Sequence, residues 1–318
     1  MFTITNPGES DITSAAKALF GGALVGIPTE TVYGLAADAE NEAAVARIYS
    51  VKGRPQNHPV IVHIGSVDYL NKWAINIPDY ALKLAKEYWP GPMTLILERS
   101  EIAKDFITGG QETVGLRVPA HTTTLALLEE FHKLGGNGIA APSANRFGAV
   151  SPTNAEAVQS ELGEFLDQSR DLIIDGGQSL VGVESTIIDC TEGFPIILRP
   201  GAISIEMIFG TTGLMSKPNI DSKIRVSGSL EQHYSPTAKI LLNGKVGPGD
   251  GFIALDYFIT PDGAVRLASP TTLEDFARTL YAALREGDKR GINRIVVIPP
   301  EGDGIAIAIR DRLARAAR

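Results

Sequence analysis

Two cations separated by a glycine mark the stretch of the sequence with the most evident chemistry. Lys52, Gly53 and Arg54 follow a short helical pattern, and a hydroxyl-rich turn at residues 28–34 precedes that pattern. Glycine adopts backbone conformations that other residues avoid, so both cations could face one cleft. Ammonium and guanidinium groups are strong donors to anions such as phosphate. The stretch therefore predicts a site for a small anion, with a solvated charged helix end as the alternative.

Two arginines stand in apolar surroundings. Arg117 lies within the apolar run 113–118, so it must either point outward at a sheet edge or have a buried partner. Arg199 ends a short apolar run.

Hydroxyl and amide side chains gather in the loops 141–153 and 182–186, although a simple helix cap is the alternative for the first loop. Open α/β sheets bind ligands at such strand ends, which favours one shared site.

The signatures of several enzyme classes are missing. The sequence has no G-x-x-x-x-G-K-[ST] phosphate loop, no G-x-G-x-x-G after a strand and no G-x-S-x-G nucleophile elbow. Ser14 and Lys17 match S-x-x-K, but the chain has no K-T-G, which favours a helix surface. His58 and His63 lack a third ligand at metal spacing. Neither nucleophilic hydrolysis nor a metal held by protein ligands is indicated.

The charge distribution argues against a general nucleic-acid-binding surface. The net charge is −8, and residues 1–235 hold 17 basic against 27 acidic residues, whereas residues 236–318 hold 12 against 10. Non-specific binding to nucleic acid needs broad neutralisation of phosphates by Lys and Arg. We therefore expect no stable nucleic-acid complex, and we interpret the cations as local contacts to a small ligand.

The composition is typical of a globular protein, with 44% hydrophobic and 21% charged residues. Cys190 is the single cysteine, so no intrachain disulfide can form. The first residues lack the basic and apolar regions of a signal peptide, and no apolar run approaches the ~18 residues of a membrane span. The sequence predicts a cytoplasmic protein without a membrane segment.

Apolar periodicity predicts alternating strands and helices, hence an α/β or α+β protein of undetermined strand order. The predicted helices are residues 11–20, 41–51, 79–88, 122–134, 155–162, 273–285 and 304–317. The predicted strands are residues 23–27, 59–64, 93–97, 113–118, 138–141, 172–174, 186–189, 196–198, 238–242, 251–255 and 294–298. Residues 210–232 show no period and are rich in Gly, Ser, Pro and charge, which is typical of a linker between two domains.

A series of motifs, taken in order, resembles the YrdC/Sua5 family of threonylcarbamoyl-AMP synthases. The motifs are P-T-E-T-V-Y-G-L, K-G-R-P, P-V-I-V-H-I, A-P-S-A-N with S-P-T, G-V-E-S-T-I and L-R-P-G. The second domain and the H-Y-S-P segment at 233–236 resemble the long, two-domain Sua5 form. The resemblance implies a YrdC-like twisted mixed sheet with helices in residues 1–209, a linker in 210–236, and a smaller Rossmann-like α/β domain in 237–318.

The resemblance also implies a reaction and a set of site residues. L-threonine, bicarbonate and ATP, the last with Mg²⁺, would give threonylcarbamoyl-adenylate and pyrophosphate, and a separate complex would then modify an adenosine of tRNA. The implied catalytic residues are Lys52 and Arg54. The implied threonine-binding residues are Thr31, His63, Arg117, Ala141 and Ser185. The implied ATP-binding residues are Lys52, Arg54, His58, Thr113, Ser143, Asn145, Ser151, Arg199 and Tyr234.

Such a reaction is consistent with the missing catalytic triad, because transfers at phosphorus depend mainly on positioning and on neutralising charge. Arg117 would pair with the threonine carboxylate. Thr31, His63 and Ser185 are the candidates to bind the threonine hydroxyl, which distinguishes threonine from valine. We expect the linker, with Tyr234, to close over the nucleotide as a lid.

Two other functions stay open. An RNA-binding or ribosome-associated module would use a concave positive face, and the acidic balance of residues 1–235 counts against it. Carbamoyl transfer in hydrogenase maturation, where a similar domain occurs, is disfavoured by the lack of Cys-rich motifs.

Overall fold

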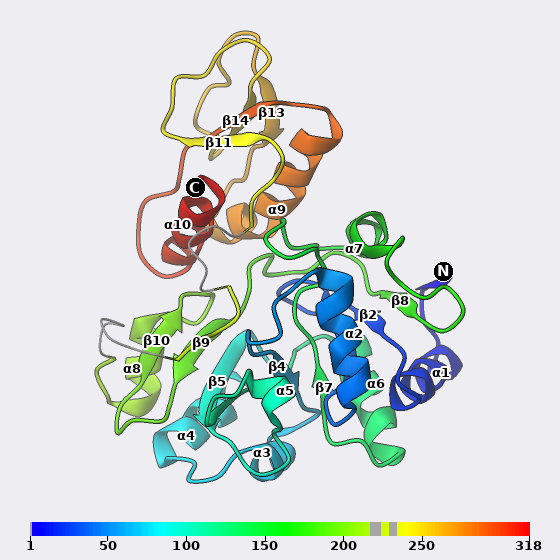
Figure 1. Cartoon of the computed structure of the whole chain (residues 1–318). Helices are drawn as coiled ribbons and strands as arrows, with labels where there is room; N and C mark the ends of the chain where they lie inside the picture. The colour runs from blue at the N-terminus through cyan, green and yellow to red at the C-terminus, as the bar shows by residue number, and fades with distance from the viewer. Residues whose placement is uncertain (1, 217–223, 229–233) are drawn as a thin grey trace.

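The computed structural model describes residues 2–216, 224–228 and 234–318, and these form two α/β units, each with its own sheet (Figure 1). The larger sheet contains parallel and antiparallel neighbours. In sheet order, its ten strands are β1 (Phe2–Thr5), β8 (Leu172–Asp175), β2 (Val25–Ile27), β3 (Gly34–Asp38), β7 (Ile139–Ala140), β4 (Ile61–His63), β6 (Thr113–Arg117), β5 (Met93–Glu98), β9 (Thr186–Asp189) and β10 (Ile196–Arg199).

Helices cover both faces of the larger sheet. Successive residues of β3 show why, because Leu35 belongs to the same buried cluster as Ile48 of α2, whereas Ala36 belongs to a second cluster with Leu19 of α1 and Leu127 of α6. The helices of this unit are α1 (Glu9–Phe20), α2 (Glu42–Lys52), the 3-10 turn η1 (Val67–Tyr69), α3 (Leu70–Trp73), α4 (Asp79–Tyr88), α5 (Asp105–Thr108), α6 (Thr122–Lys133), α7 (Ala155–Leu162) and α8 (Ile205–Thr212).

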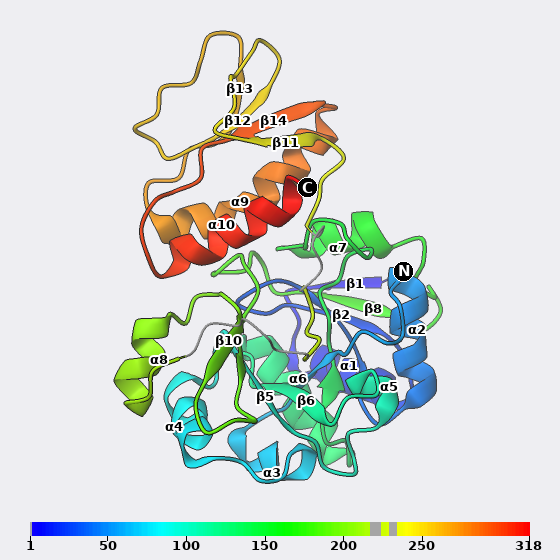
Figure 2. The same cartoon turned by 60° about the vertical axis from the view of Figure 1, so that its left-hand side comes forward.

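The smaller unit is a parallel sheet with two long helices. Its strands, in sheet order, are β11 (Lys239–Leu242), β14 (Arg294–Val297), β12 (Gly251–Ile253) and β13 (Val265–Ala268). Helices α9 (Leu273–Lys289) and α10 (Ile305–Ala316) lie between this sheet and the larger unit (Figure 2). The two helices therefore form the side of the smaller unit that faces the rest of the protein.

The predicted fold class is confirmed, and each predicted helix and strand corresponds to an observed element within a few residues. Strands β1, β3 and β13 and helices α5 and α8 were not predicted. All five residues of β3 are buried, so the strand lacks the alternation of polar and apolar residues that marks a half-exposed strand.

The linker region is described only in part. Helix α8 extends to Thr212 and packs on α4, where the Tyr88 hydroxyl donates to Met207 O at 3.0 Å. The predicted lid includes residues 217–223 and 229–233, and these, with His233 of H-Y-S-P, lie outside the described residues. No helix in the described part of the chain has the length and apolar character needed to cross a bilayer.

Candidate active site

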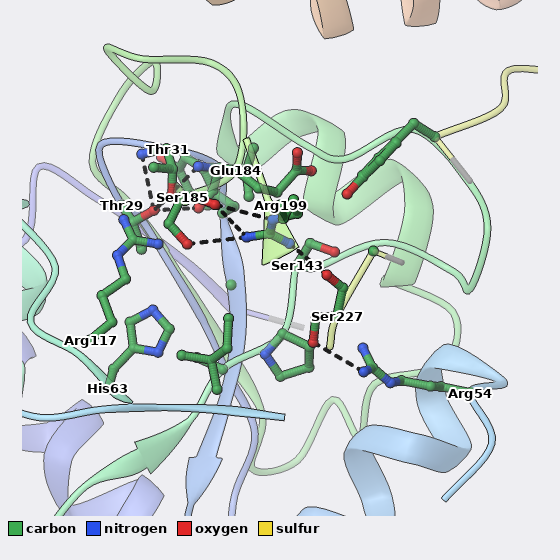
Figure 3. Close-up of a pocket in the computed structure, with 18 residues that line it drawn as sticks. Thr29, Thr31, Arg54, His63, Arg117, Ser143, Glu184, Ser185, Arg199 and Ser227 are labelled. Atoms are coloured by element: carbon green, nitrogen blue, oxygen red, sulfur yellow. Dashed lines mark hydrogen bonds between the residues drawn. The ribbon is translucent and has the colours of Figure 1, made fainter. Parts of the chain in front are cut away.

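A cavity in the larger unit is lined by segments that are distant in the sequence (Figure 3). Because β4 and β6 are parallel neighbours, His63 and Arg117 are register partners at the carboxyl ends of their strands. Other lining residues follow β2, β7 and α2, precede β9 or end β10. The predicted site residues that line this cavity are Thr31, Arg54, His63, Arg117, Ala141, Ser143, Ser185, Arg199 and Tyr234.

Hydroxyl groups form one wall of the cavity. Thr31 Oγ1 lies 2.9 Å from Thr29 Oγ1, and Ser185 Oγ lies 2.7 Å from Thr94 Oγ1. Thr31 and Ser185 are almost fully buried. Both are thus fixed by neighbouring hydroxyls, which is the kind of rigid polar wall that a hydroxyl-bearing ligand requires.

His63 is a buried, neutral member of the cavity lining. The pKa of His63 is lowered to about 3, mainly by burial and then by the charge of Arg117. The ring is therefore uncharged at neutral pH. It can donate or accept a hydrogen bond without adding charge to the site.

We expect the neutral state of His63 to make the protein less stable as the pH falls below about 6.5, the ordinary histidine value. Between pH 6.5 and about 3 the unfolded chain binds a proton at this residue that the native state does not. The free energy of unfolding should then decrease by up to about 1.4 kcal/mol per pH unit. Urea unfolding at pH 7 and pH 5 should show a smaller pH-dependent loss in His63→Gln than in wild type, and an equal loss would contradict this assignment.

Arg117 has a buried partner, which was one of the two alternatives for an arginine within an apolar run; the other was an outward position at a sheet edge. Its Nη2 donates to Glu30 Oε1 at 2.6 Å, and its Nε donates to Gly91 O at 3.2 Å. Glu30 also accepts from Ala120 N at 3.0 Å. The edge-exposed alternative is wrong, because the Arg117 side chain is only 5% exposed.

Arg199 and Arg54 are buried cations whose bonded partners are neutral. Arg199 donates to Ser185 O and Ser185 Oγ, and to Ser227 O at 2.8 Å. Arg54 Nη2 donates to Pro59 O at 2.7 Å and Ser227 Oγ at 3.1 Å, and its Nε has no partner among the described residues. Burial lowers the pKa of Arg54 to about 10, so it stays protonated at pH 7. A buried guanidinium group without a hydrogen-bonded carboxylate is suited to an anionic ligand.

Lys52 does not line the cavity, in contrast to its neighbour Arg54. It is 2% exposed, and its Nζ donates to the carbonyl oxygens of Ser143 and Asn145. The intervening Gly53 has φ 63° and ends α2 in the left-handed conformation. The alternative of a solvated helix end is therefore wrong. The two hydrogen bonds of Lys52 hold the 143–145 loop in place.

Replacement of Lys52 by methionine should destabilise the protein by about 1–3 kcal/mol, because two buried carbonyl groups would lose their donor. Urea unfolding measures the change. Lys17, which is exposed on α1, gives the matched control, and Lys17→Met should change stability by less than about 0.5 kcal/mol. An unaltered unfolding midpoint in Lys52→Met would show that the loop does not depend on this side chain.

Four other predicted ATP contacts also lie outside the cavity lining. His58 packs edge-on against Phe147 at 5.5 Å, and Thr113 lines an adjacent hollow. Asn145 donates to Ala149 O at 2.9 Å, and Ser151 donates to Glu184 Oε1 at 2.6 Å. Helix α7 is capped by Asn154, so the helix-cap alternative for Ser151 and Thr153 is wrong.

Two carboxylates, one behind the cavity lining and one in it, were not among the predicted site residues. Glu30 stands in T-E-T-V-Y-G-L and pairs with Arg117, and Glu184 stands in G-V-E-S-T-I and lines the cavity. Glu184 Oε2 accepts from Tyr281 of α9 at 2.9 Å and from Arg312 of α10 at 2.8 Å. Each glutamate stands next to hydroxyl residues in a motif that was singled out, and nothing in the local pattern showed that its carboxylate would be buried.

A polar cavity lined by arginines at the strand ends of a mixed α/β fold is the kind of site that suits a small anionic ligand. A family model for Sua5, YciO and YrdC, described as "Telomere recombination", matches residues 17–201, and a model described as the C-terminal domain of threonylcarbamoyl-AMP synthase matches residues 203–318. The chain belongs to the two-domain Sua5 family of threonylcarbamoyl-AMP synthases, as the motifs predicted.

Known relatives match along nearly the whole chain. The threonylcarbamoyl-AMP synthase of Pyrococcus abyssi is 38% identical over 97% of this chain and 94% of its own length, and that of Bacillus subtilis is 35% identical over 97% and 93%. The crystal structure of P. abyssi Sua5 in complex with L-threonine is 37% identical and superposes with a TM-score of 0.88 over 99% of this chain and 97% of that one.

Proposed function

We propose that this enzyme makes threonylcarbamoyl-adenylate and pyrophosphate from L-threonine, bicarbonate and ATP. The observation that carries the proposal is a hydroxyl-lined cavity next to two buried guanidinium groups, Arg54 and Arg199, that have no bonded carboxylate among the described residues. The hydroxyl-lined cavity suits a small hydroxy amino acid, and the two guanidinium groups suit a polyphosphate.

The chemistry asks little acid–base work of the protein. The threonine amine and bicarbonate give a carbamate and water, and a carbamate oxygen then attacks the α-phosphorus of ATP as pyrophosphate leaves. Arg54 and Arg199 would neutralise phosphate charge, and Thr31 and Ser185 would bind the amino acid. Arg117 uses Nε and one N–H of Nη2 within the protein, so a threonine carboxylate would bind its remaining N–H groups on Nη1 and Nη2.

Mg²⁺ is proposed to accompany ATP and to bind its phosphate oxygens. No group of three or more His, Cys, Asp or Glu side chains is arranged to hold a metal in the described parts of the chain. Glu30 and Glu184 are both engaged by arginines. This fits Mg²⁺, which commonly keeps its waters and binds through substrate phosphates.

We further propose a cytoplasmic enzyme, because ATP and threonine are available there, and transfer of the product to a separate complex that modifies a tRNA adenosine. The acidic balance of residues 1–235 gives no broad surface for stable binding of tRNA itself.

The decisive experiment measures pyrophosphate release by the purified chain. Release should require threonine, bicarbonate and Mg²⁺ together. Release that is independent of threonine would contradict the proposal. Tight, steeply salt-dependent tRNA binding without turnover would instead favour an RNA-binding module.

A further inference from the structure

The smaller unit supplies two side chains that reach the border of the cavity. Tyr281 of α9 and Arg312 of α10 are 0% and 1% exposed, and both bond Glu184 Oε2. The other carboxylate oxygen of Glu184 accepts from Ser151 at 2.6 Å. One buried carboxylate of the larger unit is therefore held from both units at once.

Arg312 also contacts the neighbours of Arg199 and the ring of Tyr234. Its Nη2 donates to Pro200 O at 3.0 Å, and its guanidinium lies 5.3 Å from the centroid of the Tyr234 ring, which lines the cavity. That ring stacks on Tyr281 at 5.7 Å. The two side chains from the smaller unit thus touch the part of the site that surrounds Arg199.

The charges around the cavity show what this arrangement does. Glu30 pairs with Arg117, and Glu184 pairs with Arg312, which leaves Arg54 and Arg199 with neutral partners. Burial acts to raise the pKa of Glu184, but the charges of Arg312 and then Arg199 outweigh it and hold this pKa at about 2. Glu184 is therefore an anion at neutral pH, and Arg199 is the next cation within its influence.

We propose that Arg312, supported by Tyr281, is a positioning residue of the active site: it neutralises Glu184 so that Arg199 stays available to the phosphates of ATP. Without Arg312, the buried Glu184 carboxylate would lack its cation and would attract Arg199, because an unpaired buried charge is costly. With Arg312 in place, the smaller unit completes the nucleotide side of the site. The inference rests on the proposed function, since it assigns Arg199 to ATP.

A simple docking role for Arg312 is the competing explanation, and the chain offers a matched comparison. Arg285 of α9 also joins the two units, through Glu161 at 3.0 Å and Val150 O, but it does not contact Glu184 or line the cavity. If Arg312 only docks the units, Arg312→Met and Arg285→Met should affect ATP binding alike.

The test is isothermal titration of the full-length protein with Mg·ATP at saturating threonine without bicarbonate. Arg312→Met should raise the Kd for ATP by about tenfold or more, and Arg285→Met should change it by less than about twofold. Adding Glu184→Gln to Arg312→Met should restore the Kd to within about threefold of wild type, because it removes the unpaired carboxylate. An unchanged Kd in Arg312→Met, or no restoration in the double variant, would overturn the proposal.

Tyr281→Phe keeps the inference testable if Arg312→Met fails to fold. This change keeps the ring and removes one hydroxyl donor to Glu184. The Kd for ATP should rise about three- to tenfold, and an unchanged Kd would contradict the proposed role. If wild type itself does not bind ATP, the proposed function fails, and this outcome is distinct from a variant that binds as wild type does.

Discussion

Replacement of Arg54 by methionine is expected to lower kcat/KM for ATP in pyrophosphate release by about 10²–10³-fold, the loss typical of removing one preorganised charge-stabilising donor. The Arg54 side chain is oriented by Pro59 O and Ser227 Oγ, and both partners are neutral. Because neither partner carries a charge, the positive charge of Arg54 is available to an anion in the cavity that it lines. A coupled assay of pyrophosphate release at varied Mg·ATP measures the effect.

The matched control is Arg170→Met, because the Arg170 side chain is 46% exposed and its ion-pair partner, Asp167, lies three residues away. This variant should keep its activity within about twofold, since an exposed ion pair contributes little. Arg54→Lys should fall between Arg54→Met and wild type, because lysine restores the charge but not the planar geometry. A folded Arg54→Met enzyme that keeps at least half of the wild-type kcat/KM would remove Arg54 from the mechanism.

The parts of the site that sequence predicted are those that local pattern determines. His63 and Arg117 each lie one residue before the end of an apolar run, and short apolar runs fold as strands. Once β4 and β6 pair in parallel, the two side chains must meet at one edge of the sheet. Motifs at strand ends therefore located the cavity although the strand order was unknown.

The exact contacts of the cations could not be predicted, because their partners are distant in sequence. Glu30 lies 87 residues from Arg117, and the carbonyl groups that Lys52 bonds lie 91 and 93 residues away. An arginine within an apolar run indicates that a partner exists. It does not identify the partner, which depends on how the strands pair.

Arg312 illustrates a signal that was present but incomplete. Ile305, Ile309 and Leu313 recur at i, i+4 and i+8 of α10, and Arg312, three residues after Ile309, lies on the same side of the helix. A charged residue on an apolar stripe indicates a buried ion pair. The partner, Glu184, lies in the other unit, and the periodicity of one helix carries no information about a contact between two domains.

Loss of the buried pair between Arg117 and Glu30 should have the largest effect on stability. Arg117→Met is expected to lower the free energy of unfolding by about 3–5 kcal/mol, because it leaves the Glu30 carboxylate buried without its cation. Urea unfolding measures this. Arg99→Met is the control: its carboxylate partners are 77% and 83% exposed, so the cost should be below about 1 kcal/mol. Equal costs in both variants would contradict the account.

The second variant of this pair separates folding from substrate binding. Arg117→Met/Glu30→Gln removes both charges, and it should recover at least half of the stability lost in Arg117→Met, since glutamine can still accept from Ala120 N. If Arg117 also binds the threonine carboxylate, as the resemblance implies, the recovered protein should still need a higher threonine concentration for pyrophosphate release. A double variant that is stable and has a wild-type KM for threonine would restrict Arg117 to a structural role.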